Sequence, residues 1–463
     1  MFSSTTYQRR REILKKEVSH GGILLLGHIE SPINFEHNTY PFRQDSSFLY
    51  YVGIQVPRLA VLFDVDENRD ILFGDEHDLD DVIWMGRQET LQDKCLKAGL
   101  QEVRPFNQLG AYIQNMSRGN RKVHYLPPYQ SYSEILLQEL FGVPRPAISP
   151  SVTLIRAVVK QRSVKEDQEI EQIEKAVQVS VDMHRLAMQI AKPGMKEFEI
   201  VNAIQKLAAD QSCSLAYPPI VTVRGEVLHN HYRQHTLQSG DMVLNDSGAE
   251  TAMGYAGDLT RTFPVDRTFT VQQREVYQVV LKAFADARCM LQPGAQFKEV
   301  HLQAARSLVT GLIELGLMHG DPEEAVQNHA HTLFFQCGLG HMMGLDVHDM
   351  EDLGEQYVGY TEDEPKDTET FGLKSLRLGK ALQSGYVITV EPGIYIIPEL
   401  IDRWQAEKKH SAFINYAALA PYRDFGGIRI EDNFLITPRG NRVLGPELMI
   451  TVDEIEAYRS SFC

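Results

Sequence analysis

Short apolar runs alternate with polar stretches of helical period over roughly the first 150 residues. Apolar runs of this length predict strands, and the periodic stretches between them predict helices. Strands and helices that alternate in this way are typical of an α/β domain. The predicted strands are Gly22–Gly27, Leu59–Val65, Asp70–Phe73 and Val123–Leu126, and the predicted helices are Tyr7–Val18, Thr90–Leu96 and Tyr132–Phe141.

A change of pattern then predicts a domain boundary. Pro144, Pro146 and Pro150 lie close together and indicate a linker. Ser163 and Glu166 match an S-x-x-E capping box, so we expect the next helix to begin there. This helix has an apolar face formed by Ile170, Ile173, Val177 and Val181. We therefore expect two domains, residues 1–155 and residues 160–463.

The second domain has a different order of elements. Two strands around a turn precede two long helices, and two further strands follow near the C-terminus. Helices placed between antiparallel strands are typical of an α+β domain. The predicted strands are Asp241–Gly248, Gly254–Pro264, Tyr386–Tyr395 and Gly427–Ile436, and the predicted helices are Gln272–Met290 and Phe297–Leu317.

Composition and charge exclude several classes of protein. With 43% hydrophobic residues, the chain is neither mainly disordered nor fibrous. Its net charge of −16 argues against nucleic acid as a partner, and the basic run Arg9–Arg11 is expected to be a solvated helix start. No apolar run is long enough to cross a membrane, and Met1–Lys16 does not resemble a signal peptide. Five widely spaced cysteines fit reduced thiols, so we expect a cytoplasmic protein.

Acidic residues inside the apolar strands of the second domain indicate chemistry. Asp246, Glu391 and Glu431 each follow an apolar run, where an ionised carboxylate needs a cation or several hydrogen bonds. Asp246 and Asp258 are equidistant from Ala252, so a hairpin that turns there would make them cross-strand neighbours on one face. Clustered oxygen ligands suit hard divalent cations such as Mn²⁺.

Histidines in a glycine-rich segment extend this candidate site. His341 ends the segment Gly338–His341, and His348 follows seven residues later. Each element has a simpler explanation, because a single buried Asp is often a structural hydrogen-bond acceptor and a Gly-rich segment with one His is often a loop. Together they predict a metal site.

The order of these motifs resembles that of the pita-bread metallopeptidases, which include methionine aminopeptidase, aminopeptidase P and prolidase. Two further segments, Tyr40–Gln44 and Ile83–Gly86, resemble the creatinase-like N-terminal domain that separates the Xaa-Pro enzymes from methionine aminopeptidases. The resemblance implies an α/β creatinase-like domain followed by an α+β pita-bread catalytic domain. The segments that match the catalytic domain are Asn245–Glu250, Tyr255–Thr262, Gly338–His341, Asp346–Asp349, Thr389–Gly393 and Gly427–Asp432.

The resemblance implies a role for each matching residue. Asp258 and Glu431 would bridge two divalent ions, most simply Mn²⁺ with Co²⁺ or Zn²⁺ as alternatives, around a nucleophilic water or hydroxide. His341 and Glu391 would complete one metal site and Asp246 the other, with Glu391 also carrying a proton. His229 and His348 would contact substrate and stabilise the oxyanion. Arg429 would share the strand face of Glu431 and orient its carboxylate.

Two positions leave alternatives open. His231 competes with His229, although ungapped spacing to Asp246 favours His229. His-x-His pairs, of which His329–His331 is a second, also occur as zinc signatures of amidohydrolases, but that interpretation leaves the acidic strands unexplained. Cys337 stands where the family commonly has another histidine, which puts one substrate contact in doubt.

The expected function is cleavage of short peptides after the residue that precedes proline, by a Xaa-Pro aminopeptidase. The alternative is a prolidase restricted to dipeptides, because Gly372–Arg377 resembles a prolidase segment whose Arg grips the substrate carboxylate. Arg377 could equally lie in a surface loop. A non-catalytic pita-bread binding domain or a creatinase-like amidinohydrolase is disfavoured by the complete ligand set. Family members imply a homodimer or homotetramer.

Overall fold

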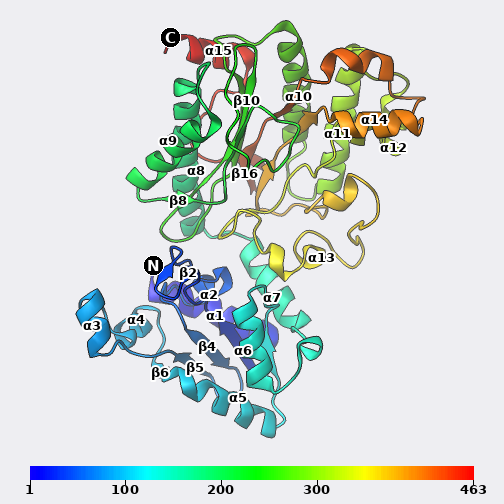
Figure 1. The fold of residues 1–463 in the computed structure, drawn as a ribbon. Coiled ribbons are helices and arrows are strands. Elements are labelled where there is room, and N and C mark those ends of the chain that lie inside the picture. The colour runs from blue at the N-terminus through cyan, green and yellow to red at the C-terminus, as the bar shows by residue number, and fades with distance from the viewer. Residues whose placement is uncertain (463) are drawn as a thin grey trace. The chain divides into compact units, whose positions relative to one another are not determined.

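The computed structural model describes residues 1–462, which form two compact units (Figure 1). Unit 1 comprises Met1–Arg162 together with Asp352–Tyr357, and unit 2 comprises Ser163–Glu351 and the chain from Val358 onward. Among the described residues, no helix combines the length and the apolar character needed to cross a membrane.

Unit 1 is built on a mixed five-stranded sheet with the order β6-β5-β4-β1-β7. The central strands β1, β4 and β5 pair antiparallel, whereas β6 and β7 add in parallel at the two edges. The predicted α/β class is confirmed. The strands are β1 Gly22–Leu26, β2 Pro32–Phe35, β3 Asn38–Thr39, β4 Ala60–Asp64, β5 Arg69–Phe73, β6 Glu102–Arg104 and β7 Val123–Tyr125.

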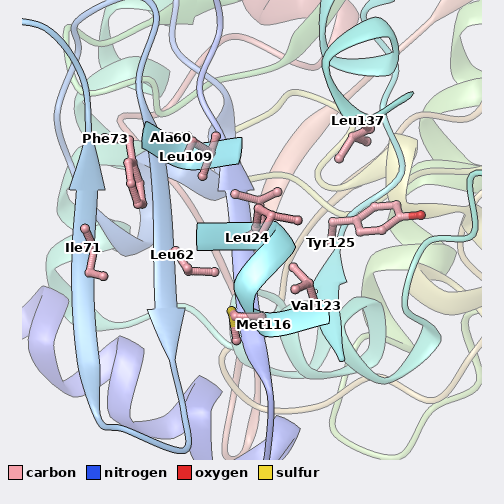
Figure 2. Close-up of a cluster of buried hydrophobic side chains, with 11 residues drawn as sticks. Leu24, Ala60, Leu62, Ile71, Phe73, Leu109, Met116, Val123, Tyr125 and Leu137 are labelled. Carbon is pink, nitrogen blue, oxygen red and sulfur yellow. The ribbon is translucent and has the colours of Figure 1, made fainter. Parts of the chain in front are cut away.

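Helices of unit 1 form a hydrophobic core together with this sheet. Leu109 and Met116 of α5 belong to one apolar cluster with strand residues such as Leu24 and Leu62 (Figure 2). Burial of these side chains is the main contribution to the stability of unit 1. The helices are α1 Ser4–Val18, α2 Ser46–Tyr51, α3 Leu79–Met85, α4 Leu91–Lys97, α5 Leu109–Arg118, α6 Ser131–Phe141 and α7 Val152–Ser163, and α13 Glu355–Val358 lies largely in the second segment of the unit.

Two local predictions for this region are wrong. Arg10 and Arg11 are buried rather than solvated, because Arg10 donates to the Tyr50 carbonyl and Arg11 forms an ion pair with Asp70. Ser163 does not begin a helix, because it is the last residue of α7, whose apolar residues continue past the proline cluster.

The following helix, α8, is capped one turn later than predicted. Glu166 is its N-cap, and the Glu169 side chain accepts a hydrogen bond from the Glu166 backbone N–H at 3.0 Å. The residues predicted to form the apolar face of α8 are buried: Ile170, Ile173, Val177 and Val181.

Unit 2 combines small antiparallel sheets with two pairs of packed helices, which confirms the α+β prediction. Its two three-stranded sheets have the orders β12-β10-β9 and β13-β16-β17, and β14 pairs with β15. The strands are β8 Ser214–Leu215, β9 Ile220–Thr222, β10 Met242–Ser247, β11 Ala249–Glu250, β12 Leu259–Pro264, β13 Val387–Val390, β14 Gly393–Tyr395, β15 Gly427–Arg429, β16 Asp432–Thr437 and β17 Gly440–Val443.

The helices of unit 2 pack as the pairs α8–α9 and α10–α11. Each pair has a continuous apolar face, so the helices bury against each other and against the neighbouring strands. The helices are α8 Asp167–Ile190, α9 Glu197–Asp210, α10 Val271–Cys289, α11 Phe297–Glu314, α12 Pro322–Gln327, α14 Pro398–Ala406 and α15 Val452–Ser460.

Candidate metal centre

Two acidic residues lie where the chain passes from one sheet to another. Glu391 follows β13 and precedes β14, and Glu431 lies between β15 and β16. The sequence predicted one continuous strand through each of them, which is wrong, because each predicted strand is split between two sheets. The Glu391 N–H donates to the Leu339 carbonyl at 2.8 Å and the Glu431 N–H to the Thr260 carbonyl at 3.0 Å. These bonds fix the backbone from which both carboxylates project.

Asp246 lies in β10 of the neighbouring sheet, and Asp258 directly precedes its strand β12. The predicted turn at Ala252 would pair them directly, but Asp246 pairs with Thr260 instead, because the short strand β11 occupies the connection. The register therefore differs from the prediction by two residues. An even shift keeps side chains on the same face of a sheet, so the two aspartates remain diagonal neighbours.

One hydroxyl joins the two aspartates. Tyr217 lies within hydrogen-bond distance of an oxygen of Asp246 at 2.6 Å and of Asp258 at 2.5 Å. A phenol has a single proton to donate, so only one carboxylate can receive it at a time. Burial and the adjacent carboxylates raise the pKa of Tyr217, which keeps the proton on the phenol.

His341 presents one ring nitrogen to the acidic residues. Its Nδ1 lies 3.0 Å from the Met342 carbonyl, which accepts an Nδ1–H bond and leaves the Nε2 lone pair available. Nε2 lies 3.4 Å from an Asp258 oxygen and 3.5 Å from a Glu391 oxygen. A backbone acceptor that fixes the tautomer in this way is typical of histidine ligands to metals.

These side chains surround one cavity of about 380 Å³. Ligand atoms of Asp258, His341 and Glu431 lie within 4.8 Å of one another, and all three residues are buried. Oε1 of Glu431 is buried and has no hydrogen-bond partner among the described residues, whereas Oε2 accepts a bond from the Thr260 hydroxyl at 2.6 Å. Four carboxylates and one imidazole match the ligand preferences of hard divalent cations, so these residues fit a metal centre. We call them the carboxylate cluster: Asp246, Asp258, His341, Glu391 and Glu431.

The electrostatics of the cluster point the same way. Burial and the neighbouring Asp246 raise the pKa of Asp258 to about 7. Burial also raises the pKa of Glu391 and, far more strongly, that of Glu431, where Asp258 adds repulsion. Burial lowers the pKa of His341. A cation would relieve this repulsion, because it favours the ionised carboxylates and the neutral imidazole.

Arg429 has a different partner from the one predicted. Its guanidinium forms an ion pair with Asp246 at 2.5 Å and donates to the Tyr395 hydroxyl at 2.9 Å. Its predicted role in orienting the Glu431 carboxylate stays a prediction, because its guanidinium is not in direct contact with that carboxylate. Arg429 reaches that residue only through Thr260, whose hydroxyl accepts from Arg429 Nε at 3.2 Å and donates to Glu431.

The remaining predicted residues line the same cavity. They include both His229 and its competitor His231, so location does not separate the two. His348 stacks edge-on against His341, with ring centroids 4.4 Å apart. Arg377 lines the cavity beside the short turn Leu373–Ser375, and its side chain is 31% exposed.

Cys337 also lines the cavity, as a neutral thiol. Its Sγ donates a weak hydrogen bond to the Tyr395 hydroxyl at 3.8 Å, and burial raises its pKa to about 12. The position therefore provides neither a charge nor a strong donor where the family commonly has an imidazole.

The second His-x-His pair lies outside the cavity lining. The pair is grouped with His301. The ring centroid of His331 lies 6.3 Å from that of His329 and 6.5 Å from that of His301. Both His301 ring nitrogens are buried and have no partner within residues 1–462. Burial lowers the pKa of His301 to about 4 and that of His331 to about 3, so these two imidazoles are neutral at pH 7.

Sequence reasoning missed several residues of the site. Thr260 could have been found, because it lies two residues after Asp258 and therefore on the same strand face. Tyr395 ended a predicted strand, but nothing in the pattern marked its hydroxyl. Tyr217 and Glu351, which contacts His348, lie outside the long strands and helices, where the sequence has no periodicity to follow.

The chain is similar in sequence to known peptidases. Residues 171–438 match the model of metallopeptidase family M24, and residues 7–125 match the aminopeptidase P N-terminal domain. The chain is 30% identical to the Xaa-Pro aminopeptidase of Escherichia coli (strain K12), covering 98% of this chain and 97% of that protein. It is also 30% identical to the Xaa-Pro dipeptidase of Homo sapiens, covering 97% and 91%.

Solved structures give the same result at the level of the fold. The proline aminopeptidase P II from Yersinia pestis superposes with a TM-score of 0.82 at 29% sequence identity, covering 99% of this chain and all of that one. The M24 match extends over more than half of the sequence and contains every member of the carboxylate cluster. The chain therefore belongs to metallopeptidase family M24.

Proposed function

We propose that this protein is a Xaa-Pro aminopeptidase, which hydrolyses the bond between an N-terminal residue and a following proline. The observation that carries the proposal is the carboxylate cluster at one cavity of an M24 chain. Relatives named Xaa-Pro aminopeptidase, which match nearly the full length, support the substrate class. Its substrates would be short peptides with proline at the second position.

The carboxylate cluster would hold two divalent ions, which we propose to be Mn²⁺, with Co²⁺ or Zn²⁺ as alternatives. Asp258 and Glu431 would be shared between the ions, with His341 and Glu391 at one ion and Asp246 at the other. Bound there, divalent ions would polarise the scissile carbonyl and lower the pKa of water. Arg429 and Tyr217 contribute by holding the aspartates in place.

Other residues of the cavity would act on the substrate itself. Glu391, whose pKa is raised by burial, would accept a proton and return it to the leaving proline nitrogen. His229 and His348 would donate hydrogen bonds to the oxygen on which negative charge develops. Glu351 accepts the Nδ1–H bond of His348, so His348 would donate to this oxygen from Nε2 as an imidazolium.

A dipeptidase is the second candidate, and Arg377 favours it. In a dipeptide, the C-terminal carboxylate lies one residue beyond the cleaved bond. A guanidinium can bind that carboxylate through two parallel hydrogen bonds, whereas a longer peptide presents a neutral amide there. Arg377 lines the same cavity as the carboxylate cluster, and the human Xaa-Pro dipeptidase is as similar in sequence as the bacterial aminopeptidase.

Further parts of the proposal concern the whole chain. We propose that residues 1–155 form a creatinase-like domain and residues 160–463 the catalytic domain. We also propose a cytoplasmic homodimer or homotetramer. Light scattering on the purified protein would give the mass of the assembly directly.

Two peptides test the function and separate the candidates. Purified protein with Mn²⁺ should cleave a Xaa-Pro-Pro tripeptide and a Xaa-Pro dipeptide. A higher kcat/KM for the tripeptide would identify an aminopeptidase, and a higher kcat/KM for the dipeptide would identify a dipeptidase. Chelator should abolish both activities, and Mn²⁺ or Co²⁺ should restore them. Undiminished activity after complete metal removal, verified by elemental analysis, would contradict the proposal.

A further inference from the structure

Glu351 connects two side chains of the cavity wall without belonging to the wall itself. Its Oε2 accepts a hydrogen bond from His348 Nδ1 at 2.5 Å and a second from Arg377 Nε at 3.3 Å. His348 and Arg377 both line the cavity, and Glu351 does not. One carboxylate oxygen therefore anchors two residues to which the proposed function gives separate tasks.

The carboxylate of Glu351 is charged at neutral pH. The hydrogen bond from His348 is the largest cause that lowers its pKa to about 2, and the charge of Arg377 acts in the same direction. Its side chain is 41% exposed, so water screens these interactions. Glu351 therefore contributes little to folding stability, and its effect falls on the positions of the side chains that it binds.

For His348, the contact fixes the ring. An imidazole on a loop can rotate and can exchange its two nitrogens between roles. A hydrogen bond from Nδ1 to a carboxylate determines which nitrogen is held and which one faces the substrate. Removing the outer partner of a metal-bound histidine typically costs about 10- to 100-fold in activity, and we expect a loss of similar order at His348.

For Arg377, the contact fixes the plane of the guanidinium. Arginine has several rotatable bonds, and ordering them on substrate binding costs free energy. The two terminal nitrogens form the fork that pairs with a carboxylate, and the Nε contact orients that fork. An anchored fork binds a substrate carboxylate more tightly than a mobile one.

We propose that Glu351 is a positioning residue that orients His348 for turnover and Arg377 for recognition of a substrate carboxylate. The inference rests on the proposed function and deepens it, because it adds a determinant of dipeptide preference. It predicts two separable kinetic effects from one side chain. The contact of Glu351 with His348 affects kcat for every substrate, and its contact with Arg377 affects KM for dipeptides alone.

The experiment compares Glu351→Ala with Glu351→Gln on a Xaa-Pro dipeptide and a Xaa-Pro-Pro tripeptide. Glu351→Ala should lower kcat about 10-fold or more on both peptides and raise KM on the dipeptide only. Glu351→Gln retains a carbonyl oxygen that accepts the Nδ1–H bond, so it should restore kcat to within about threefold. It lacks the charge that holds Arg377, so the dipeptide KM should stay raised.

Two controls define the outcome. Glu369→Ala removes an exposed glutamate that lies between Glu351 and Arg377 in the sequence, and its kinetics should match those of the wild type. In an Arg377→Ala background, Glu351→Ala should raise the dipeptide KM no further. Wild-type kinetics for Glu351→Ala, or equal defects of the Ala and Gln variants on both peptides, would overturn the inference while leaving the proposed function intact. A wild-type protein that cleaves neither peptide would overturn the proposed function and this inference with it.

Discussion

The cavity of unit 2 has two regions that differ in burial. The carboxylate cluster lies deep, with Asp258, His341 and Glu431 at 5%, 4% and 2% exposure. The rim, which we define as the lining residues His229, His348 and Arg377 with Glu351 behind them, is more exposed. The side chains of Arg377 and Glu351 are 31% and 41% exposed. Charges that water cannot reach interact strongly, whereas exposed charges are screened. Substitutions in the cluster should therefore abolish activity, and substitutions at the rim should change it selectively.

The largest effect is expected for Glu431→Gln. The substitution keeps the shape of the side chain but removes the charge of a carboxylate shared between the proposed ions. Turnover should fall below detection, and bound metal measured by elemental analysis should decrease. Glu447→Gln, at an exposed position of unit 2, is the matched control. Full metal content with normal turnover would show that Glu431 is not a ligand.

A smaller loss is expected for His348→Ala at the rim. The residue contacts a proposed ligand only through its ring, so metal content should be retained while kcat falls roughly 10²- to 10³-fold. Parallel measurement of kcat and bound metal distinguishes the two regions of the cavity. Loss of metal in this variant would place His348 with the carboxylate cluster instead.

Arg377→Ala should affect one substrate and spare the other. A bidentate pair with a carboxylate is worth roughly 1.5 to 3 kcal/mol, so kcat/KM for a Xaa-Pro dipeptide should fall about 10- to 150-fold. Cleavage of a tripeptide should be unchanged or improved, because it presents no carboxylate there. Equal small effects on both substrates would assign Arg377 to the solvated surface and favour the aminopeptidase.

The pH dependence of stability should reveal the cluster in the metal-free protein. The pKa of Asp258 is raised to about 7 in the folded state and is about 3.9 in an unfolded chain. Between these values the folded state binds more protons, so its free energy of unfolding falls as pH rises.

Divalent ions remove this penalty, because they bind the ionised carboxylates and release protons. The rise in Tm on adding Mn²⁺ to chelated protein should therefore be larger at pH 8 than at pH 5.5. An identical rise at both pH values would contradict the raised pKa.

The smallest effect on activity is expected for His301→Phe, remote from the cavity lining. The substitution removes two buried nitrogens that have no partner in the described part of the chain, so kcat/KM should stay within about twofold of wild type. Burial holds the pKa of His301 at about 4, below its usual 6.5, so the folded state binds fewer protons and loses stability as pH falls through this range. The variant should lose less Tm between pH 7 and pH 5 than the wild type does.

The contrast between cluster and rim also explains what the sequence could predict. An acidic residue after an apolar run is conspicuous, because burying a charge is costly, and this marked Asp246, Glu391 and Glu431. Their family motifs then predicted the order of the site. The strand breaks at Glu391 and Glu431 were not predicted, because each flanking run is apolar and both halves have strand character.

The rim was harder to predict, because loops have no period. Arg377 was identified only by resemblance, and its location at the cavity could not be separated from a surface loop. Glu351 was missed because three residues of a turn bring it back to His348, and nothing in the local pattern marks that return. Pairings of this kind depend on backbone geometry that composition does not encode.

The passage of the chain between sheets at Glu391 and Glu431 has a mechanical consequence. Asp246 lies in β10 and Asp258 directly precedes β12 of the same sheet, whereas the two glutamates lie at the ends of strands in the neighbouring sheets. The bridge between Thr260 and Glu431 is the point at which backbone joins β12 to this neighbouring layer. Any cation bound by both sets of carboxylates would therefore cross-link the neighbouring sheets. Removing the cation would weaken the contact between the sheets, while the hydrogen bonding within each sheet would remain.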